Sequence, residues 1–124
     1  MGRALVVAAS VALLLGVTGV AAASRAPTAS EGRAIRAAVE RFVEKPRSQA
    51  HGSTLRRIRV STVSPRYALA KLRSPGAPML ASAVLERRKG RWRVVTFGIA
   101  GFPFKGVPKP VLNDLLGATI CDCY

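Results

Sequence analysis

Residues 79–99 read MLASAVLERRKGRWRVVTFGI, which is two runs of mostly apolar residues divided by a short polar break. The break is Arg88-Lys89-Gly90-Arg91, and its glycine is typical of a tight hairpin loop. The segment therefore predicts strands over 79–88 and 92–99. Because parallel strands need a long crossover, a connection this short favours an antiparallel pair.

Two further runs rich in β-branched and apolar residues precede this hairpin, over 56–63 and 67–73. The breaks after them carry turn-forming residues, Ser64-Pro65 and Ser74-Pro75-Gly76. Connections of this length again favour antiparallel neighbours. The sequence predicts one four-stranded antiparallel meander.

A helix is predicted before the strands, between Thr28 and Pro46. Thr28 and Glu31 have the spacing of a capping box, and proline excludes the helical conformation at the residue before it. The apolar residues between them recur with the period of one helix face: Ile35, Ala38, Val39, Phe42 and Val43. A short closing helix is predicted over 111–116. The expected fold class is α+β, with the N-terminal helix packed on the meander and a short C-terminal helix.

The first 23 residues have the layout of a secretory signal peptide. Arg3 precedes an apolar run over 4–20, and Ala21 and Ala23 give the A-x-A cleavage pattern. We predict cleavage after Ala23 and a secreted, extracytoplasmic protein. The alternative is an uncleaved N-terminal membrane anchor, because the apolar stretch approaches the ~20 residues that span a bilayer.

Cleavage at that site divides the chain into four parts. The signal peptide is 1–23, a connector follows over 24–29, a single α+β domain covers 30–120, and a Cys-x-Cys tail occupies 121–124. The mature chain would have 101 residues and a net charge of +13, since only Arg3 is lost among the charged residues.

The chain is strongly basic. It has 124 residues, with 20 Lys and Arg against 6 Asp and Glu, and a formal net charge of +14. Its 49% hydrophobic residues exclude a disordered basic tail. Residues 56–93 carry 11 of the cations and one acid, Glu86.

Strand parity predicts where these cations lie. Side chains alternate between the two faces of a strand, so pairs two residues apart share a face. We predict one basic patch for polyanion binding, made by Arg57, Arg59, Lys71, Arg73, Arg91 and Arg93. The opposite parity is expected to seat the helix: Ile58, Val60, Ala68, Ala70, Leu72, Trp92 and Val94.

Three segments together resemble small uncharacterised secreted proteins of high-GC Gram-positive bacteria. The segments are RVSTVSPRYA over 59–68, GRWRVVTFG over 90–98, and Val107-Pro108 with Val111, Asp114 and Leu115. The resemblance covers residues 30–121 and implies a cystatin-like or NTF2-like fold. It also implies a bridge between a Cys after the last long strand and one near the chain end. This chain departs from that pattern, because Phe104 stands in the first place and both Cys121 and Cys123 lie at the end.

Few residues are candidates for chemistry. Enzymes of the NTF2-like type place a tuned Asp or His in a pocket between helix and sheet. The acids and the histidine here are Asp114, Asp122, Glu31, Glu40, Glu44, Glu86 and His51, and none is predicted inside a strand facing the helix. We therefore expect no catalytic residue, no cofactor and no metal site. Cys121 and Cys123 could form a strained internal bridge, bridge two chains, hold a soft metal, or have no specific role.

The expected function is a non-enzymatic basic binding module at the cell envelope, contacting an anionic polymer or a protein partner. Nucleic acid is not the favoured ligand, because the chain is exported and lacks a recognition helix. One alternative is an NTF2-like small-ligand or enzymatic pocket lined by Phe42, Tyr67, Trp92 and Val94. Another is a homodimer, since Phe97 and Ile99 share the parity of the basic residues. A third is a basic face that reflects genome composition alone.

Overall fold

The structure is a computed structural model and describes residues 24–99 and 104–117. The elements are α2 (Ala29–Glu44), β1 (Thr54–Val60), β2 (Tyr67–Arg73), β3 (Leu80–Arg88), β4 (Arg91–Ile99) and α3 (Lys109–Leu116). The strands form one antiparallel sheet in the order β1-β2-β3-β4. The α+β meander predicted from the sequence is confirmed, with β1 displaced to end at Val60. The predicted signal peptide and the Cys-x-Cys tail lie outside the described residues.

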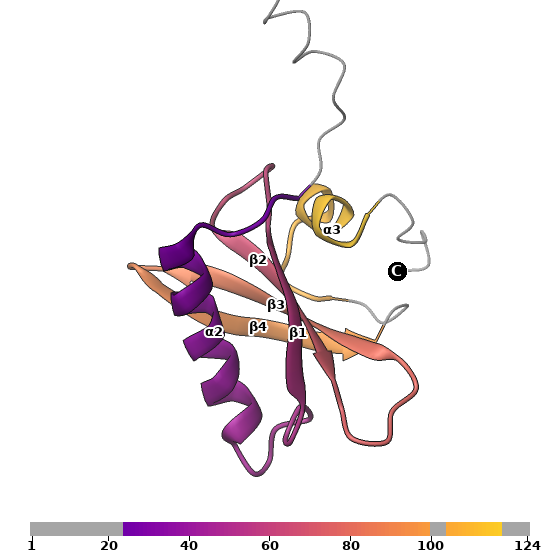
Figure 1. The fold of residues 1–124 in the computed structure, drawn as a ribbon. Helices are drawn as coiled ribbons and strands as arrows, with labels where there is room; N and C mark the ends of the chain where they lie inside the picture. The colour runs from indigo at the N-terminus through magenta and orange to yellow at the C-terminus, as the bar shows by residue number, and fades with distance from the viewer. Residues whose placement is uncertain (1–23, 100–103, 118–124) are drawn as a thin grey trace, which may run out of the picture.

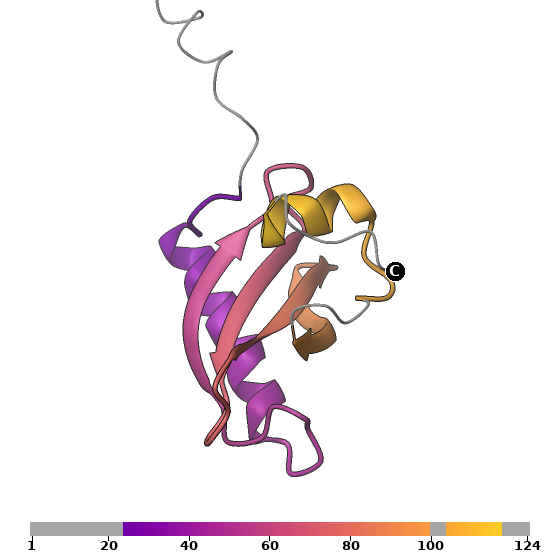
Figure 2. The ribbon, with the colours of Figure 1, turned by 90° about the vertical axis from the view of Figure 1, so that its right-hand side faces the viewer.

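The two helices lie on opposite faces of the sheet (Figures 1 and 2). α2 runs across one face and contacts β4 and β1, whereas α3 lies over β2 on the other face. Neither helix is long and apolar enough to cross a membrane, and this holds for all helical segments in the described part of the chain.

The ends of α2 are set by local sequence. The Glu31 backbone N–H donates to Thr28 Oγ1 at 3.2 Å, and the Thr28 N–H donates to Glu31 Oε1 at 2.9 Å. These reciprocal bonds are the predicted capping box. At the other end Lys45 has an extended backbone, as expected for a residue before Pro46.

The larger core lies between α2 and the sheet. Its strand residues have the parity predicted to seat the helix, and Trp92 closes it near the β3–β4 hairpin. Many of its members are small: Ala38, Ala50, Ala68, Ala70 and Ala83 are buried in it. Small side chains let the helix approach the sheet closely.

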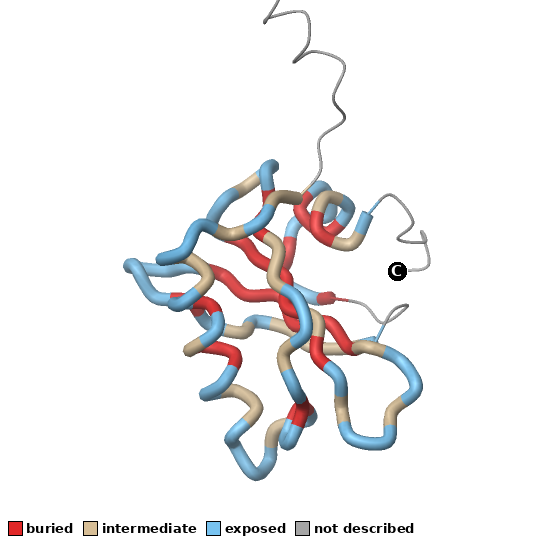
Figure 3. Tube along the Cα trace, in the orientation of Figure 1, coloured by how far each residue is buried: buried red, intermediate tan, exposed pale blue. Residues whose placement is uncertain are grey.

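A second core lies under α3. It consists of Tyr67, Leu69, Val84, Phe104, Val107, Val111, Leu112 and Leu115. The two central strands are therefore covered on both faces, which Figure 3 shows as the red tube at the centre of the molecule.

One carboxylate joins α3 to the loop after β1. Asp114 Oδ2 accepts from the Thr62 N–H at 2.7 Å and from Ser61 Oγ at 2.8 Å, and it lies 3.4 Å from the Val63 nitrogen. Bonds to an ionised acceptor are stronger than neutral ones. Asp114 thus acts as a structural anchor for α3.

A β-bulge in β4 changes the parity of its second half. Leu85 is opposite Val94 and Val84 is opposite Thr96, so Val95 is an extra residue. Beyond it, Phe97 packs on the α2 side, with its ring centroid 5.7 Å from that of Phe42. The expectation that Phe97 and Ile99 share the face of the basic residues was wrong, because the parity rule assumes an unbroken ladder.

The two edges of the sheet differ. At the β1 edge, Arg25 exchanges two backbone hydrogen bonds of 2.8 Å with Val60. At the β4 edge, no residue of the described ranges pairs with the outer side of the strand. β4 is therefore open along its length in the described sheet, whereas β1 is paired only at its Val60 end.

Candidate functional site

An open hollow of about 1290 Å³ lies along β4, beside α2. On the helix side it is lined by Ala34, Ala37, Ala38, Arg41, Phe42 and Lys45; on the sheet side by Glu86 and residues 88–95. Ala34 and Ala37 explain the space, because a methyl group extends too little to fill the gap beside the edge strand. We call this feature the β4 groove.

The charges of the β4 groove are almost all positive. Its cations are Arg41, Lys45, Arg88, Lys89, Arg91 and Arg93, all exposed. Only Arg88 is in an ion pair, with its Nε 2.8 Å from Glu86 Oε1. The other five form no ion pair within residues 24–99 and 104–117.

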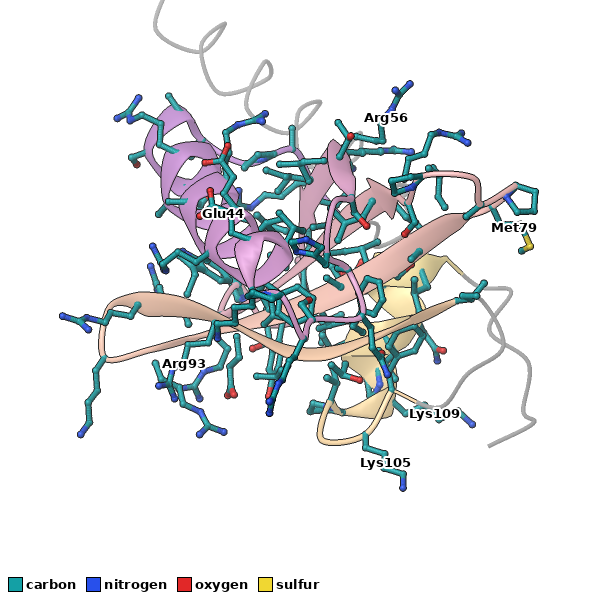
Figure 4. The ribbon with its side chains drawn as sticks, turned by 90° about the horizontal axis from the view of Figure 1, so that it is seen from below. Glu44, Arg56, Met79, Arg93, Lys105 and Lys109 are labelled. Carbon is teal, nitrogen blue, oxygen red and sulfur yellow. The ribbon has the colours of Figure 1, made fainter. Side chains whose placement is uncertain are left out.

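The hairpin turn concentrates these cations at one end of the groove. Lys89 and Gly90 have φ values of 50° and 77°, so the two-residue loop is of the I′ kind that matches strand twist. The tight reversal places Arg88 opposite Arg91 and Glu86 opposite Arg93 in the ladder. Figure 4 shows Arg93 projecting from the sheet on the side away from α2.

Glu86 is the one acid at this end, and its carboxylate is already engaged. The residue is 7% exposed, accepts from Tyr67 Oη at 3.2 Å, and lies 4.0 Å from the Arg66 Nε. Burial, and then the charge of Glu86, raise the pKa of Tyr67. Because Arg88 and Arg66 offset Glu86, the charge presented by the groove stays positive.

The six residues predicted for polyanion binding fall into two groups. Arg91 and Arg93 line the β4 groove. The other four lie on β1 and β2, and the core under α3 covers the sheet between the groups at Leu69 and Val84. The single continuous patch is therefore divided. The sequence analysis did not include Arg41 and Lys45 among the candidate residues, although their i,i+4 spacing puts them on one side of the helix.

Two of the four residues on β1 and β2 have local structural contacts. Arg59 donates from Nε to Ser24 Oγ at 3.1 Å and also contacts the Ser24 carbonyl. Lys71 Nζ donates to Ser82 Oγ at 2.7 Å. Burial, and then repulsion from Arg57, lower the pKa of Lys71. Arg57 and Arg73 remain exposed.

A lysine with a lowered pKa beside a serine hydroxyl is a combination that can support nucleophilic catalysis. Here Ser82 is 1% exposed and lies in a central strand paired on both sides. A substrate carbonyl cannot reach this hydroxyl, and the paired backbone offers no free N–H group for an oxyanion. The Lys71–Ser82 contact is therefore a partly buried polar pair in the sheet.

The other residues considered as candidates for a pocket, for catalysis or for metal binding do not form one site either. Phe42, Trp92 and Val94 line the β4 groove, but Tyr67 belongs to the core on the opposite face, so the four do not form one pocket. His51 is exposed, with Nδ1 3.2 Å from the Val43 carbonyl oxygen. No three potential metal ligands converge within the described ranges. Cys121 and Cys123 lie outside those ranges.

Comparisons with protein-family models, with curated proteins and with solved structures gave no match to this chain. The function of the protein is therefore inferred from the geometry of the β4 groove.

Proposed function

We propose that this protein is a non-enzymatic binding module at the cell envelope, which holds an extended anionic chain in the β4 groove. The observation that carries the proposal is the set of six cations around one open hollow, where the single acid of the lining is buried and paired. Anionic envelope polymers and acidic protein segments are the two ligand classes that we propose.

The electrostatics support a ligand with many charges. Five exposed cations, which form no ion pair with any other described residue, repel one another, and a bound polyanion relieves that repulsion and releases its own counterions. A ligand with several charges close together is favoured because the cations gather at the hairpin, at the first residues of β4 and at the C-terminal end of α2.

The proposal includes export through residues 1–23, on the strength of the A-x-A pattern and the apolar run before it. It also includes a cystatin-like or NTF2-like fold, supported by the order of one helix followed by a four-stranded antiparallel meander.

The test is retention on heparin, used as a generic linear polyanion, in ~0.15 M salt. Two double variants with the same change in net charge separate the groove from the other cations. Arg91→Glu with Arg93→Glu changes the groove, and Arg57→Glu with Arg73→Glu changes β1 and β2; all four side chains are exposed. We expect the first variant to elute at clearly lower salt than the second.

Circular dichroism and thermal unfolding verify that both variants remain folded. Elution of the unaltered protein below ~0.15 M salt would refute polyanion binding altogether. Equal shifts in the two variants would mean that net charge, not the groove, determines retention.

A further inference from the structure

The outer edge of β4 is a row of backbone groups directed into a basic groove. An edge strand alternates N–H and C=O groups that can pair with another extended chain. Arg25 covers the end of the opposite edge at Val60, whereas no described residue covers β4. The open edge and the groove coincide over Arg91–Val94, before the bulge at Val95 interrupts the ladder.

The side chains along this stretch alternate in chemistry. Trp92 and Val94 face the α2 side, where Ala34 and Ala37 leave room. Arg93 projects on the other side of the sheet (Figure 4), and Arg91, two residues before it in the strand, shares that face. An added strand would place its own side chains in the same alternation, each beside its cross-strand neighbour.

We infer that the ligand of the β4 groove is an acidic polypeptide segment that binds in extended form as a fifth strand on β4. This inference rests on the proposed function and specifies its ligand class. Acidic residues of the segment lie beside Arg91 and Arg93, and small apolar residues alternate with them against Val94 and the alanines of α2. Arg41 and Lys45 attract the acidic segment from the helix side.

Charge also restricts what can occupy this edge. A second copy of the chain would bring Arg91 and Arg93 against the same residues of the first, and like charges directly opposite destabilise a strand pair. An acidic strand has the complementary charge and supplies backbone partners that a polysaccharide or polyphosphate lacks. A peptide therefore satisfies both features of the site, the cations and the unpaired backbone.

The test uses an acetylated and amidated peptide, Gly-Glu-Val-Glu-Val-Glu-Gly, with the full-length protein. Two analogues keep the same charge, one N-methylated at the glutamates and the other at the valines. Alternate N–H groups of a strand point to opposite edges, so strand addition needs only one of the two sets. We expect one analogue to bind about tenfold or more weakly, and the other to bind within about threefold of the parent.

Hydrogen exchange of the β4 amides gives a second readout, since the outward N–H groups of Arg91–Val94 should become protected when the parent peptide binds. Equal affinity of both analogues and the parent would overturn strand addition. If heparin retains the protein but the parent peptide and both analogues bind with equal affinity, the proposed function stands and this inference is rejected. Failure of both heparin and peptide to bind in ~0.15 M salt would reject the proposed function as well.

Discussion

Replacing Asp114 with alanine should loosen α3 from the rest of the molecule. Its Oδ2 accepts the Ser61 hydroxyl at 2.8 Å and the Thr62 N–H at 2.7 Å. A hydrogen bond to a charged group contributes about 1.5–3 kcal/mol. Thr62 is exposed, so water replaces most of what it loses, but Ser61 is 0% exposed and is left with an unsatisfied donor. We expect the free energy of unfolding to fall by about 2–3 kcal/mol.

Urea unfolding followed by far-UV circular dichroism measures this loss. Asn113→Ala is the matched control, because Asn113 is the adjacent exposed residue of α3, and surface changes cost less than about 0.5 kcal/mol. Asp114→Asn should fall between the two, since the amide keeps one acceptor oxygen without the charge. If Asp114→Ala were no less stable than Asn113→Ala, the carboxylate would not be what holds α3 on the sheet.

Three further predictions concern other parts of the fold. Hydrogen bonds from Arg25 and then from the Thr28 N–H lower the pKa of Glu31 to about 2 from its ordinary 4.5, so this stabilisation is present above about pH 5 and is lost as pH falls toward 2. Because Arg25 is 38% exposed, Glu31→Gln should lower the free energy of unfolding by only about 1 kcal/mol at pH 7. The variant should also lose less stability than the unaltered protein as pH falls, as measured by urea unfolding at several pH values. Phe97→Ala should cost about 2 kcal/mol in chemical denaturation because its ring packs on Phe42; a cost no larger than that of Val95→Ala would contradict the packing. Gly90→Ala should lower the free energy of unfolding by about 1 kcal/mol through backbone strain alone, since φ is +77° and no atom lies within 4 Å of the added methyl group.

The parts of the fold that could be predicted depend on short-range rules. The capping box of Thr28 and Glu31 spans three residues, Pro46 acts on its neighbour, and the Lys89-Gly90 loop leaves no choice but an antiparallel partner. The parity of β1, β2 and the first half of β4 correctly separated the helix-facing residues from the basic ones.

The errors come from features that one sequence does not reveal. The bulge adds one residue, Val95, to β4. Its only trace in the sequence is the adjacent apolar pair Val94-Val95. Counting the alternation through that pair placed Phe97 on the wrong face. The division of the basic patch depends on α3 docking over Leu69, which involves long-range packing and the hydrogen bond between Asp114 and Ser61. The groove depends on where α2 crosses the sheet, which the sequence does not specify. The i,i+4 spacing of Arg41 and Lys45 showed that they share one side of the helix, but not that this side faces β4.

The alanine-rich layer under α2 also determines which sequences this fold can tolerate. Ala68, Ala70 and Ala83 are fully buried beneath the helix, and an added methylene there typically costs about 1–3 kcal/mol through overpacking. A saturation-mutagenesis survey should therefore find these positions restricted to the smallest residues, while exposed β4 positions such as Arg91 and Arg93 accept many replacements. Natural variation can accordingly change the charge of the groove without disturbing the helix-to-sheet distance on which the domain depends.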